Sequence, residues 1–130
     1  MIIARTRQEL SQTLKLLSKK PGKLSLIPTM GNLHDGHLSL VKIAKLKSTK
    51  TIATIFVNPL QFGKNEDYKK YPRTQELDIQ KLEKEKCDVL FMPMNQNEVF
   101  QNLTKIKQID SGPLGSELCG KLRPNHFNFT

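Results

Sequence analysis

The chain has 130 residues, of which 37% are hydrophobic and 25% charged, and its formal net charge at pH 7 is +9. This length accommodates one domain, or part of one, with a single modest core. No stretch approaches the ~20 apolar residues of a membrane span, and the apolar run at residues 1–5 is too short for a signal peptide. We therefore expect a cytoplasmic protein with no membrane partner.

The first predicted element is a helix that begins with a capping box, in which Thr6 caps the amino end and Glu9 returns the hydrogen bond. Three leucines follow at helical spacing and predict an inward face, and Pro21 with Gly22 ends the helix. The pattern then predicts a short apolar strand, a loop and a second helix, with the strand at 24–28 and the helix at 36–47.

β-branched residues make 51–57 the clearest strand in the chain. After it we expect a loop, a helix, a strand, a less regular strand and a short helix, at 58–73, 74–86, 88–92, 105–110 and 113–121. Strands that alternate with helices predict parallel β-α-β units with right-handed crossovers. The expected fold class is α/β, a Rossmann-like parallel sheet with flanking helices, in one domain over residues 1–130.

The cysteines and histidines do not predict a metal site. Cys87 and Cys119 are the two cysteines, and neither belongs to a C-x-x-C pair. Without an export signal, two reduced thiols are the default. His34 and His37 could begin a zinc site, but no second ligand pair follows at a suitable spacing.

The positive charge raises the question of an anionic partner such as nucleic acid. The lysines are scattered, and at residues 81–86 they alternate with acids, as on a solvated helix face. No recognition helix, zinc finger or RNA-binding aromatic signature accompanies them. A non-catalytic module that binds nucleic acid or other anions is therefore kept as a minor alternative.

The segment after the first expected strand, residues 28–37, predicts a binding site. An open parallel sheet places its ligands at such a junction, and free N–H groups with the helix dipole attract phosphate there. Gly31 and Gly36 let the backbone approach a ligand closely. His34 and His37 fall on one side of a helical turn, where N–H donors would stabilise charge on phosphate oxygens.

The competing interpretation is that these histidines merely cap the helix or are exposed. It would be favoured for one histidine alone. Two histidines with two glycines at a strand-to-helix junction favour the anion site instead.

The pattern His-x-Gly-His at 34–37 is the signature of a nucleotidyl-transferring superfamily that includes class I aminoacyl-tRNA synthetases. The longer string at 28–40, Pro-Thr-Met-Gly-x-Leu-His-x-Gly-His-x-x-Leu, closely resembles pantothenate synthetase. Three further blocks agree in order and spacing, at 55–62, 71–74 and 118–127. The resemblance covers essentially the whole chain. The block at 58–62 argues against another enzyme of the superfamily, such as a cytidylyltransferase.

This resemblance implies ATP-dependent condensation of pantoate with β-alanine to pantothenate. Pantoate would attack ATP to give pantoyl-adenylate and pyrophosphate, and β-alanine would then displace AMP. ATP would be a substrate accompanied by Mg²⁺, and no covalent enzyme intermediate is expected. The implied partners are these small molecules, without nucleic acid or membrane, and the intact family protein is typically a homodimer.

Carried over residue by residue, the catalytic histidine would be His37, with His34 beside it on the nucleotide. The ATP-contacting loop would comprise Met30, Gly31, Asn32, Leu33, His34, Asp35, Gly36 and His37. The pantoate pocket would be shaped by Pro28, Thr29, Met30 and Phe62, with Asn58 close by. Gln61 would hydrogen-bond pantoate and lie near the β-alanine site. Arg123 and His126 would lie near the substrate-side wall, although a structural role for their turn is equally consistent.

The last block departs from the family pattern at Asn125, where glycine is common, but asparagine is the next-best residue for a left-handed turn. Residues 115–121 have the glycine and lysine spacing of a P-loop. Leu122 stands where Ser or Thr must bind magnesium, so we interpret this spacing as coincidence. Cys119 is expected to be a packed thiol rather than a nucleophile.

Family members are considerably longer than this chain. Two later nucleotide-binding strings, of the Gly-x-Lys-Asp and Ser-Ser-Arg-Asn types, do not occur here. We therefore expect the N-terminal part of the nucleotide-binding domain, without the C-terminal domain, and little or no ligase activity from this part alone. The strand at 24–28 would also present an open apolar edge, which favours self-association.

Overall fold

The structure is a computed structural model that describes residues 1–62, 69 and 73–100. The chain divides into two compact units, the first being Met1–Phe56 with Pro72–Val99 and the second Val57–Tyr71 with Phe100–Thr130.

Several sequence predictions lie outside the described residues. They are the strand at 105–110, the helix at 113–121, the P-loop-like spacing at 115–121, and the residues Cys119, Arg123 and His126.

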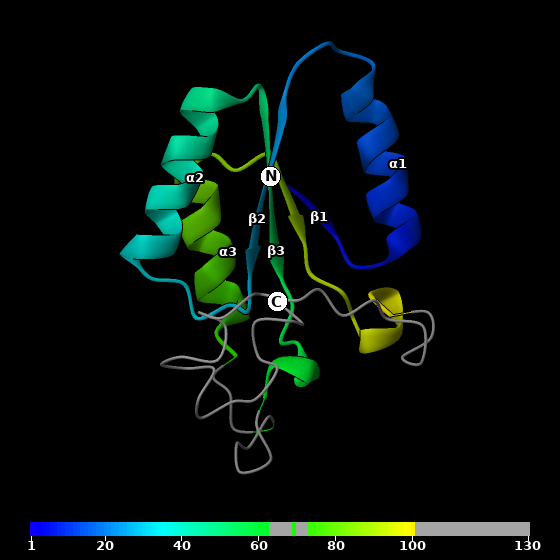
Figure 1. The fold of residues 1–130 in the computed structure, drawn as a ribbon, viewed down its shortest axis with the longest axis vertical. Helices are drawn as coiled ribbons and strands as arrows, with labels where there is room; N and C mark the ends of the chain where they lie inside the picture. Colours follow the sequence, from blue (N-terminus) through cyan, green and yellow to red (C-terminus); the bar gives the residue numbers. More distant parts are fainter. Residues whose placement is uncertain (63–68, 70–72, 101–130) are drawn as a thin grey trace, which may run out of the picture. The chain divides into compact units, whose positions relative to one another are not determined.

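Four parallel strands form the sheet of the first unit, in the order β1-β4-β3-β2 (Figure 1). They are β1 (Ile2–Ala4), β2 (Leu24–Thr29), β3 (Lys50–Ile55) and β4 (Val89–Phe91). Neighbouring strands run in the same direction, with Leu26 beside Ile52 and Ala53 beside Leu90. The Rossmann-like α/β sheet expected from the sequence is confirmed, and so are the three predicted strands that fall within the described residues.

The strand β1 is not predicted by the sequence pattern. Residues 1–5 show only a short apolar run, and three residues are too few to reveal a strand period. In the structure Ile2 lies beside Val89, and its N–H donates to the Asp88 carbonyl oxygen at 2.9 Å. All three residues of β4 are buried, so its backbone requires a hydrogen-bonding partner on each edge, and β1 supplies one of them.

Three helices cover the two faces of the sheet, with α1 on one side and α2 and α3 together on the other (Figure 1). They are α1 (Arg7–Ser18), α2 (Asp35–Lys47) and α3 (Gln75–Lys84), and a short 3-10 helix, η3 (Gln96–Glu98), follows β4. The predicted capping box of α1 is confirmed. Among the described residues, no helix is both long and apolar enough to cross a bilayer.

The hydrophobic core of the first unit includes the loop that follows β2. One buried cluster contains Leu33 from this loop, Val41 from α2, Leu82 from α3 and Leu90 from β4. The side chain of Leu33 is only 2% exposed. The strand-to-helix junction predicted to bind a ligand is therefore anchored in the core.

The strand β2 lies at the edge of the described sheet, with β3 as its neighbour. Leu24 and Leu26 are 52% and 63% exposed. Beside them lies a shallow hollow whose lining includes Leu26, Pro28, Leu40 and Ile43. The open apolar edge expected from the sequence is thus present in the described part of the chain, and self-association through it stays a prediction.

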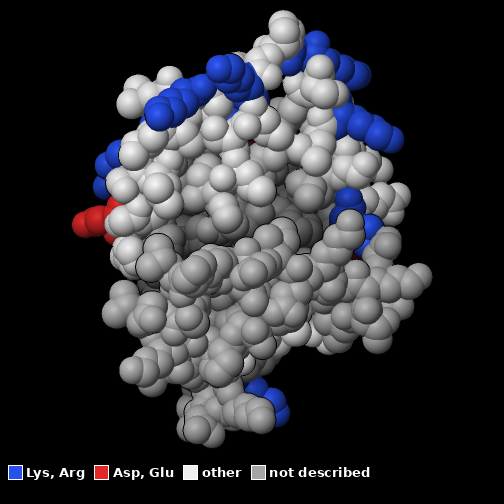
Figure 2. Space-filling view, viewed as in Figure 1, with Lys and Arg blue, Asp and Glu red and all other residues white. Residues whose placement is uncertain are grey.

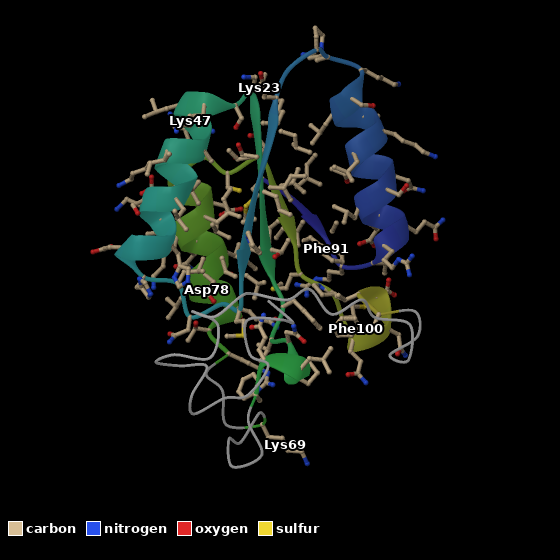
Figure 3. All side chains as sticks on the ribbon, viewed as in Figure 1. Lys23, Lys47, Lys69, Asp78, Phe91 and Phe100 are labelled. Carbon is tan, nitrogen blue, oxygen red and sulfur yellow. The ribbon has the colours of Figure 1, made fainter. Side chains whose placement is uncertain are left out.

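Basic side chains gather at one end of the first unit. Figure 2 shows Lys and Arg over the upper end of the visible face, and Figure 3 places Lys23 and Lys47 at that end. This is the amino end of β2, because β2 begins at Leu24. Asp78 of α3 lies toward the opposite end in the same view (Figure 3).

Candidate functional site

The loop from β2 to α2 turns through two consecutive left-handed residues, Gly31 (φ 83°) and Asn32 (φ 51°). Thr29, at the end of β2, accepts the Gly31 N–H at 3.1 Å and donates its own hydroxyl to the Thr54 carbonyl of β3 at 2.7 Å. The turn therefore begins from a threonine that is itself fixed to the neighbouring strand.

Glycine is required at position 31 for two reasons. Its φ lies in the region that L side chains rarely adopt. A Cβ there would also lie 3.1 Å from Oδ2 of Asp78 and 3.1 Å from Cγ2 of Ile55. Gly31 thus permits the close approach of a protein side chain, Asp78, whereas the expected close approach of a ligand stays a prediction.

Asp78 on α3 holds this loop in place (Figure 3). Its side chain is 1% exposed, and its carboxylate accepts the N–H groups of Asn32 and Leu33, both at 2.8 Å, and the Thr74 hydroxyl at 3.2 Å. A buried carboxylate is tolerated only with such partners. None of the sequence motifs points to Asp78, although its position four residues before the buried Leu82, on the inward side of α3, is a local indication of a buried acid.

Lys81, also on α3, donates its ammonium group to the Leu33 carbonyl oxygen at 2.6 Å. Leu33 is thus held at three points: its side chain lies in the core, its N–H bonds to Asp78, and its carbonyl bonds to Lys81. The residue that immediately precedes His34 consequently has little freedom to move.

The two histidines meet at the amino end of α2. His34 is the N-cap, and its Nδ1 accepts the Gly36 N–H at 3.1 Å, while Nδ1 of His37 accepts the His34 N–H at 3.3 Å. The ring centroids are 4.1 Å apart and the planes are tilted by 46°. From these bonds we assign the proton of each neutral ring to Nε2, because Nδ1 acts as the acceptor.

The competing interpretation of the histidines is therefore correct in one respect, since both cap the helix. The capping uses Nδ1 and leaves an Nε2–H donor on each ring. Gly36 is required for this arrangement, because a Cβ at that position would lie 2.8 Å from Cε1 of His34. The predicted cluster of two histidines and two glycines is thus brought together in one turn.

Burial lowers the pKa of His37 below its ordinary value, and the neighbouring His34 lowers it further, whereas the Asp78 carboxylate acts to raise it. The net shift is downward, which favours a neutral His37 near pH 7. A neutral ring with its proton on Nε2 can donate a hydrogen bond from that nitrogen although it carries no positive charge.

The N–H groups of the loop are engaged by protein acceptors. Those of Asn32 and Leu33 bond to Asp78, and those of Gly31, His34 and Gly36 bond to side chains within the same turn. The expectation of free N–H groups at this junction is wrong for these residues. What this turn offers an anion is the Nε2–H of each histidine and the positive end of the α2 dipole.

The remaining predicted ATP and pantoate residues of the first unit belong to the same segment. Pro28, Asn32, His34, Asp35 and Gly36 are exposed, whereas Thr29, Met30 and His37 are half-buried and Gly31 and Leu33 are buried. The exposed group is accessible to a ligand, and the buried pair supports it.

Asn58, Gln61 and Phe62 lie in the second unit, where Asn58 caps the short 3-10 helix η1 (Pro59–Gln61). Oδ1 of Asn58 accepts the Leu60 N–H at 3.0 Å. Asn58 and Gln61 are each 9% exposed, and Phe62 is half-buried. The asparagine therefore fixes the turn that carries Gln61.

The parallel sheet with helices on both faces, and a histidine pair at the carboxyl end of one strand, places the chain in the class of Rossmann-like α/β proteins. The sequence matches the family described as pantoate-beta-alanine ligase over residues 2–129. The chain belongs to the pantoate–β-alanine ligase family.

Individual relatives agree with this assignment. The pantothenate synthetase of Neisseria meningitidis serogroup C is 46% identical over 114 residues, which is 88% of this chain and 41% of the relative. That of Caldicellulosiruptor bescii is 42% identical over 131 residues, 98% of this chain and 45% of the relative.

Solved structures show the same fold. The pantoate-beta-alanine ligase of Francisella tularensis, complexed with beta-gamma ATP and beta-alanine, matches with a TM-score of 0.84 and 37% identity, over 99% of this chain and 49% of that one. The pantothenate synthetase of Thermus thermophilus matches with a TM-score of 0.79 and 37% identity, over 98% of this chain and 44% of that one. The chain thus spans less than half the length of these relatives.

Proposed function

We propose that this chain supplies the part of a pantoate–β-alanine ligase that binds ATP and pantoate, for condensation of pantoate with β-alanine through a pantoyl-adenylate. One structural observation carries the proposal, in support of the family assignment: His34 and His37 both have an Nε2–H donor at the amino end of α2. The Francisella relative was solved with an ATP ligand and β-alanine, which supports the same substrates here.

In the first half-reaction, the pantoate carboxylate attacks the α-phosphorus of ATP and pyrophosphate leaves. Charge builds on the phosphate oxygens, and the Nε2–H groups of His34 and His37 donate to them, together with the α2 dipole. The lowered pKa of His37 keeps that ring neutral, so the ring acts as a hydrogen-bond donor near pH 7.

In the second half-reaction, the amine of β-alanine attacks the activated acyl carbon and AMP leaves. Pantoate is proposed to lie against Pro28, Thr29, Met30 and Phe62, with Gln61 as hydrogen-bond donor and acceptor and Asn58 close by. Gln61 is also proposed to lie near β-alanine. No protein nucleophile is needed in either step.

Mg²⁺ is proposed to enter with the phosphates of ATP, the usual mode for this ion. Within residues 1–62, 69 and 73–100, no group of three or more His, Cys, Asp or Glu side chains could hold a metal. We further propose that the intact protein is a cytoplasmic homodimer, as the resemblance implies.

A chimera tests this proposal without relying on the activity of residues 1–130 alone. The matched segment of the Neisseria meningitidis enzyme is replaced by this chain, and two activities are measured: pantoate-dependent exchange of pyrophosphate into ATP, and pantothenate formation. Both activities are expected, and His37→Ala is expected to reduce the exchange by about 100-fold or more. Lys23→Ala, at the amino end of β2, is the control.

Exchange that does not depend on pantoate, or that survives His37→Ala, would contradict the proposed roles. A chimera that exchanges pyrophosphate but forms no pantothenate would limit the proposal to the first half-reaction.

A second candidate function, binding of a polyanion such as nucleic acid, is favoured by the basic side chains around Lys23 and Lys47 (Figures 2 and 3). Its signature would be binding to random duplex DNA that weakens steeply with salt and is lost in the double variant Lys23→Ala, Lys47→Ala. Such binding, with no response of the chain to ATP, would replace the ligase proposal.

A further inference from the structure

A chain of hydrogen bonds runs from α3 to the ring of His37. The Lys81 ammonium donates to the Leu33 carbonyl oxygen at 2.6 Å, and the same peptide group ends in the His34 N–H, which donates to Nδ1 of His37 at 3.3 Å. A positive ammonium group that donates to the carbonyl oxygen polarises the peptide group, and this makes the N–H of that group a stronger hydrogen-bond donor. Lys81 therefore favours the tautomer of His37 in which Nδ1 accepts and Nε2 carries the proton.

Asp78 fixes the preceding peptide group from the same helix. Its two carboxylate oxygens accept the N–H groups of Asn32, the second residue of the left-handed pair, and of Leu33, which follows it. Successive N–H groups in such a turn converge on one anion, and here that anion is a protein carboxylate. Asp78 and Lys81, three residues apart on α3, thus hold the two peptide groups that flank Leu33.

We propose that Asp78 and Lys81 are positioning residues for the histidine pair: Asp78 sets the place of the loop, and Lys81 acts through the Leu33–His34 peptide group to keep the proton of His37 on Nε2. This inference deepens the proposed function and rests on it, because the orientation of the two rings matters only if they meet a nucleotide.

A purely structural role does not account for this arrangement. The Asp78 carboxylate alone satisfies the N–H groups of Asn32 and Leu33, and a loop that only had to be held in place would not need the further Lys81 charge on the Leu33–His34 peptide group. Both charges act on the backbone of Leu33, which is buried in the core and immediately precedes the exposed His34. Asp78 also influences His37 electrostatically. Its carboxylate acts to raise the pKa of the His37 ring, whereas His34 acts to lower it.

The first test follows the tautomer of His37 in the full 130-residue chain, from the ¹⁵N chemical shifts of its ring at a pH where it is neutral. The wild-type ring is expected to be almost entirely in the Nε2–H form. Lys81→Met removes the donor to Leu33 but keeps the length of the side chain, and it is expected to shift the ring toward a mixture of tautomers. Lys81→Arg restores a donor and is expected to restore the wild-type shifts.

The second test measures Asp78→Asn by two signals, the pKa of His37 and the affinity for ATP, both followed by NMR titration. Because the carboxylate acts to raise the pKa of His37, its removal is expected to lower that pKa further. The loss of a charged acceptor for two N–H groups is expected to weaken ATP binding by about tenfold.

The chain offers a matched control pair at the other end of the sheet. Asp88 accepts the N–H and hydroxyl of Thr51 and lies 3.5 Å from the Lys50 ammonium. Asp88→Asn and Lys50→Met remove the same chemical groups away from the histidines. They are expected to leave the His37 tautomer and pKa unchanged, and ATP affinity within about twofold.

The inference is overturned if Lys81→Met leaves the ring shifts of His37 unchanged, or if the control pair alters them as much as Lys81 and Asp78 do. If Asp78→Asn does not fold, Lys81→Met decides, because it leaves the buried carboxylate in place. If ATP perturbs neither histidine of the wild-type chain, the proposed function fails, and the tautomer and pKa measurements still decide whether α3 positions the pair.

Discussion

Two aspartates at opposite ends of the same sheet use similar hydrogen bonds for different purposes. Asp78 is fully buried and gives its oxygens to two N–H groups of the loop after β2 and to a threonine hydroxyl. Asp88 precedes β4 and holds Thr51 of β3 by its N–H and its hydroxyl, with Lys50 nearby. One carboxylate thus shapes the loop after β2, and the other joins two strands.

A similar bonding pattern therefore does not imply a similar electrostatic role. Asp88 is partly exposed and lies beside lysines, so screening by water limits what its ion pair contributes. Asp78 has no such access to water. The effects of mutating the two residues should therefore differ both in size and in where they appear.

The largest expected difference is in stability. Asp78→Ala leaves two N–H groups without their acceptor and is expected to lower the free energy of unfolding by about 3 kcal/mol. Asp88→Ala is expected to lower it by about 1 kcal/mol, because water can replace part of the lost interaction. Urea unfolding of the two variants measures both changes. Equal losses would mean that the burial of Asp78 has no special consequence.

The two glycines of the loop are also expected to differ in what a substitution by alanine changes. Gly31→Ala forces a side chain into a left-handed conformation beside Asp78 and Ile55, and is expected to cost about 2 kcal/mol of unfolding free energy. Gly36→Ala lies at the start of α2, and is expected to change stability by no more than about 0.5 kcal/mol while displacing the His34 ring.

Urea unfolding and ATP titration together separate these two effects. ATP binding that is unaffected by Gly36→Ala would mean that the position of the His34 ring is unimportant.

Asp88 is expected to make the stability of the fold depend on pH, because its pKa is shifted in the folded state. Partial burial acts to raise the pKa of Asp88, but the N–H and hydroxyl of Thr51 and the charges of Lys50 and Lys45 outweigh it, and the net shift is downward. A lowered pKa in the folded state gives a stabilisation that is complete above the unfolded value, about pH 4, and is lost as the pH falls through the folded value.

Asp88→Asn is therefore expected to be less stable than wild type near pH 7, with the difference shrinking below about pH 4. Urea unfolding at a series of pH values measures it. A difference that stays constant with pH would show that the charge of Asp88 does not contribute.

The smallest expected effect concerns the histidines themselves. His34 acts to lower the pKa of His37, so His34→Gln is expected to raise that pKa, the opposite direction to Asp78→Asn. NMR titration of His37 in the two variants measures the signs. Shifts in the same direction would indicate that the loop has rearranged and that the two neighbours do not act separately.

The sequence predicts the elements whose signals are local. The capping box of Thr6 and Glu9 lies within one turn, and the β-branched run at 51–57 marks a strand by composition alone, so both are found in the structure. The strand β1 could not be predicted, because three residues have no visible period and the strand is specified by its partner β4, which lies far along the chain.

The site shows the same division. The closeness of His34 and His37 follows from their spacing, but the use of Nδ1 for capping depends on backbone geometry that no motif specifies. The role of Asp78 depends on how α3 docks against a loop 45 residues earlier in the sequence. A carboxylate on an inward helical position was the one local indication of that role.

The pairing of β1 with β4 has a consequence for the order in which the protein forms during synthesis. Val89 is synthesised well after its register partner Ile2, because most of the described chain lies between them. At a usual elongation rate of roughly 5–20 residues per second, the first strand waits for several seconds without its partner. During that interval β1 cannot complete the sheet, because the strand that it pairs with has not yet been made.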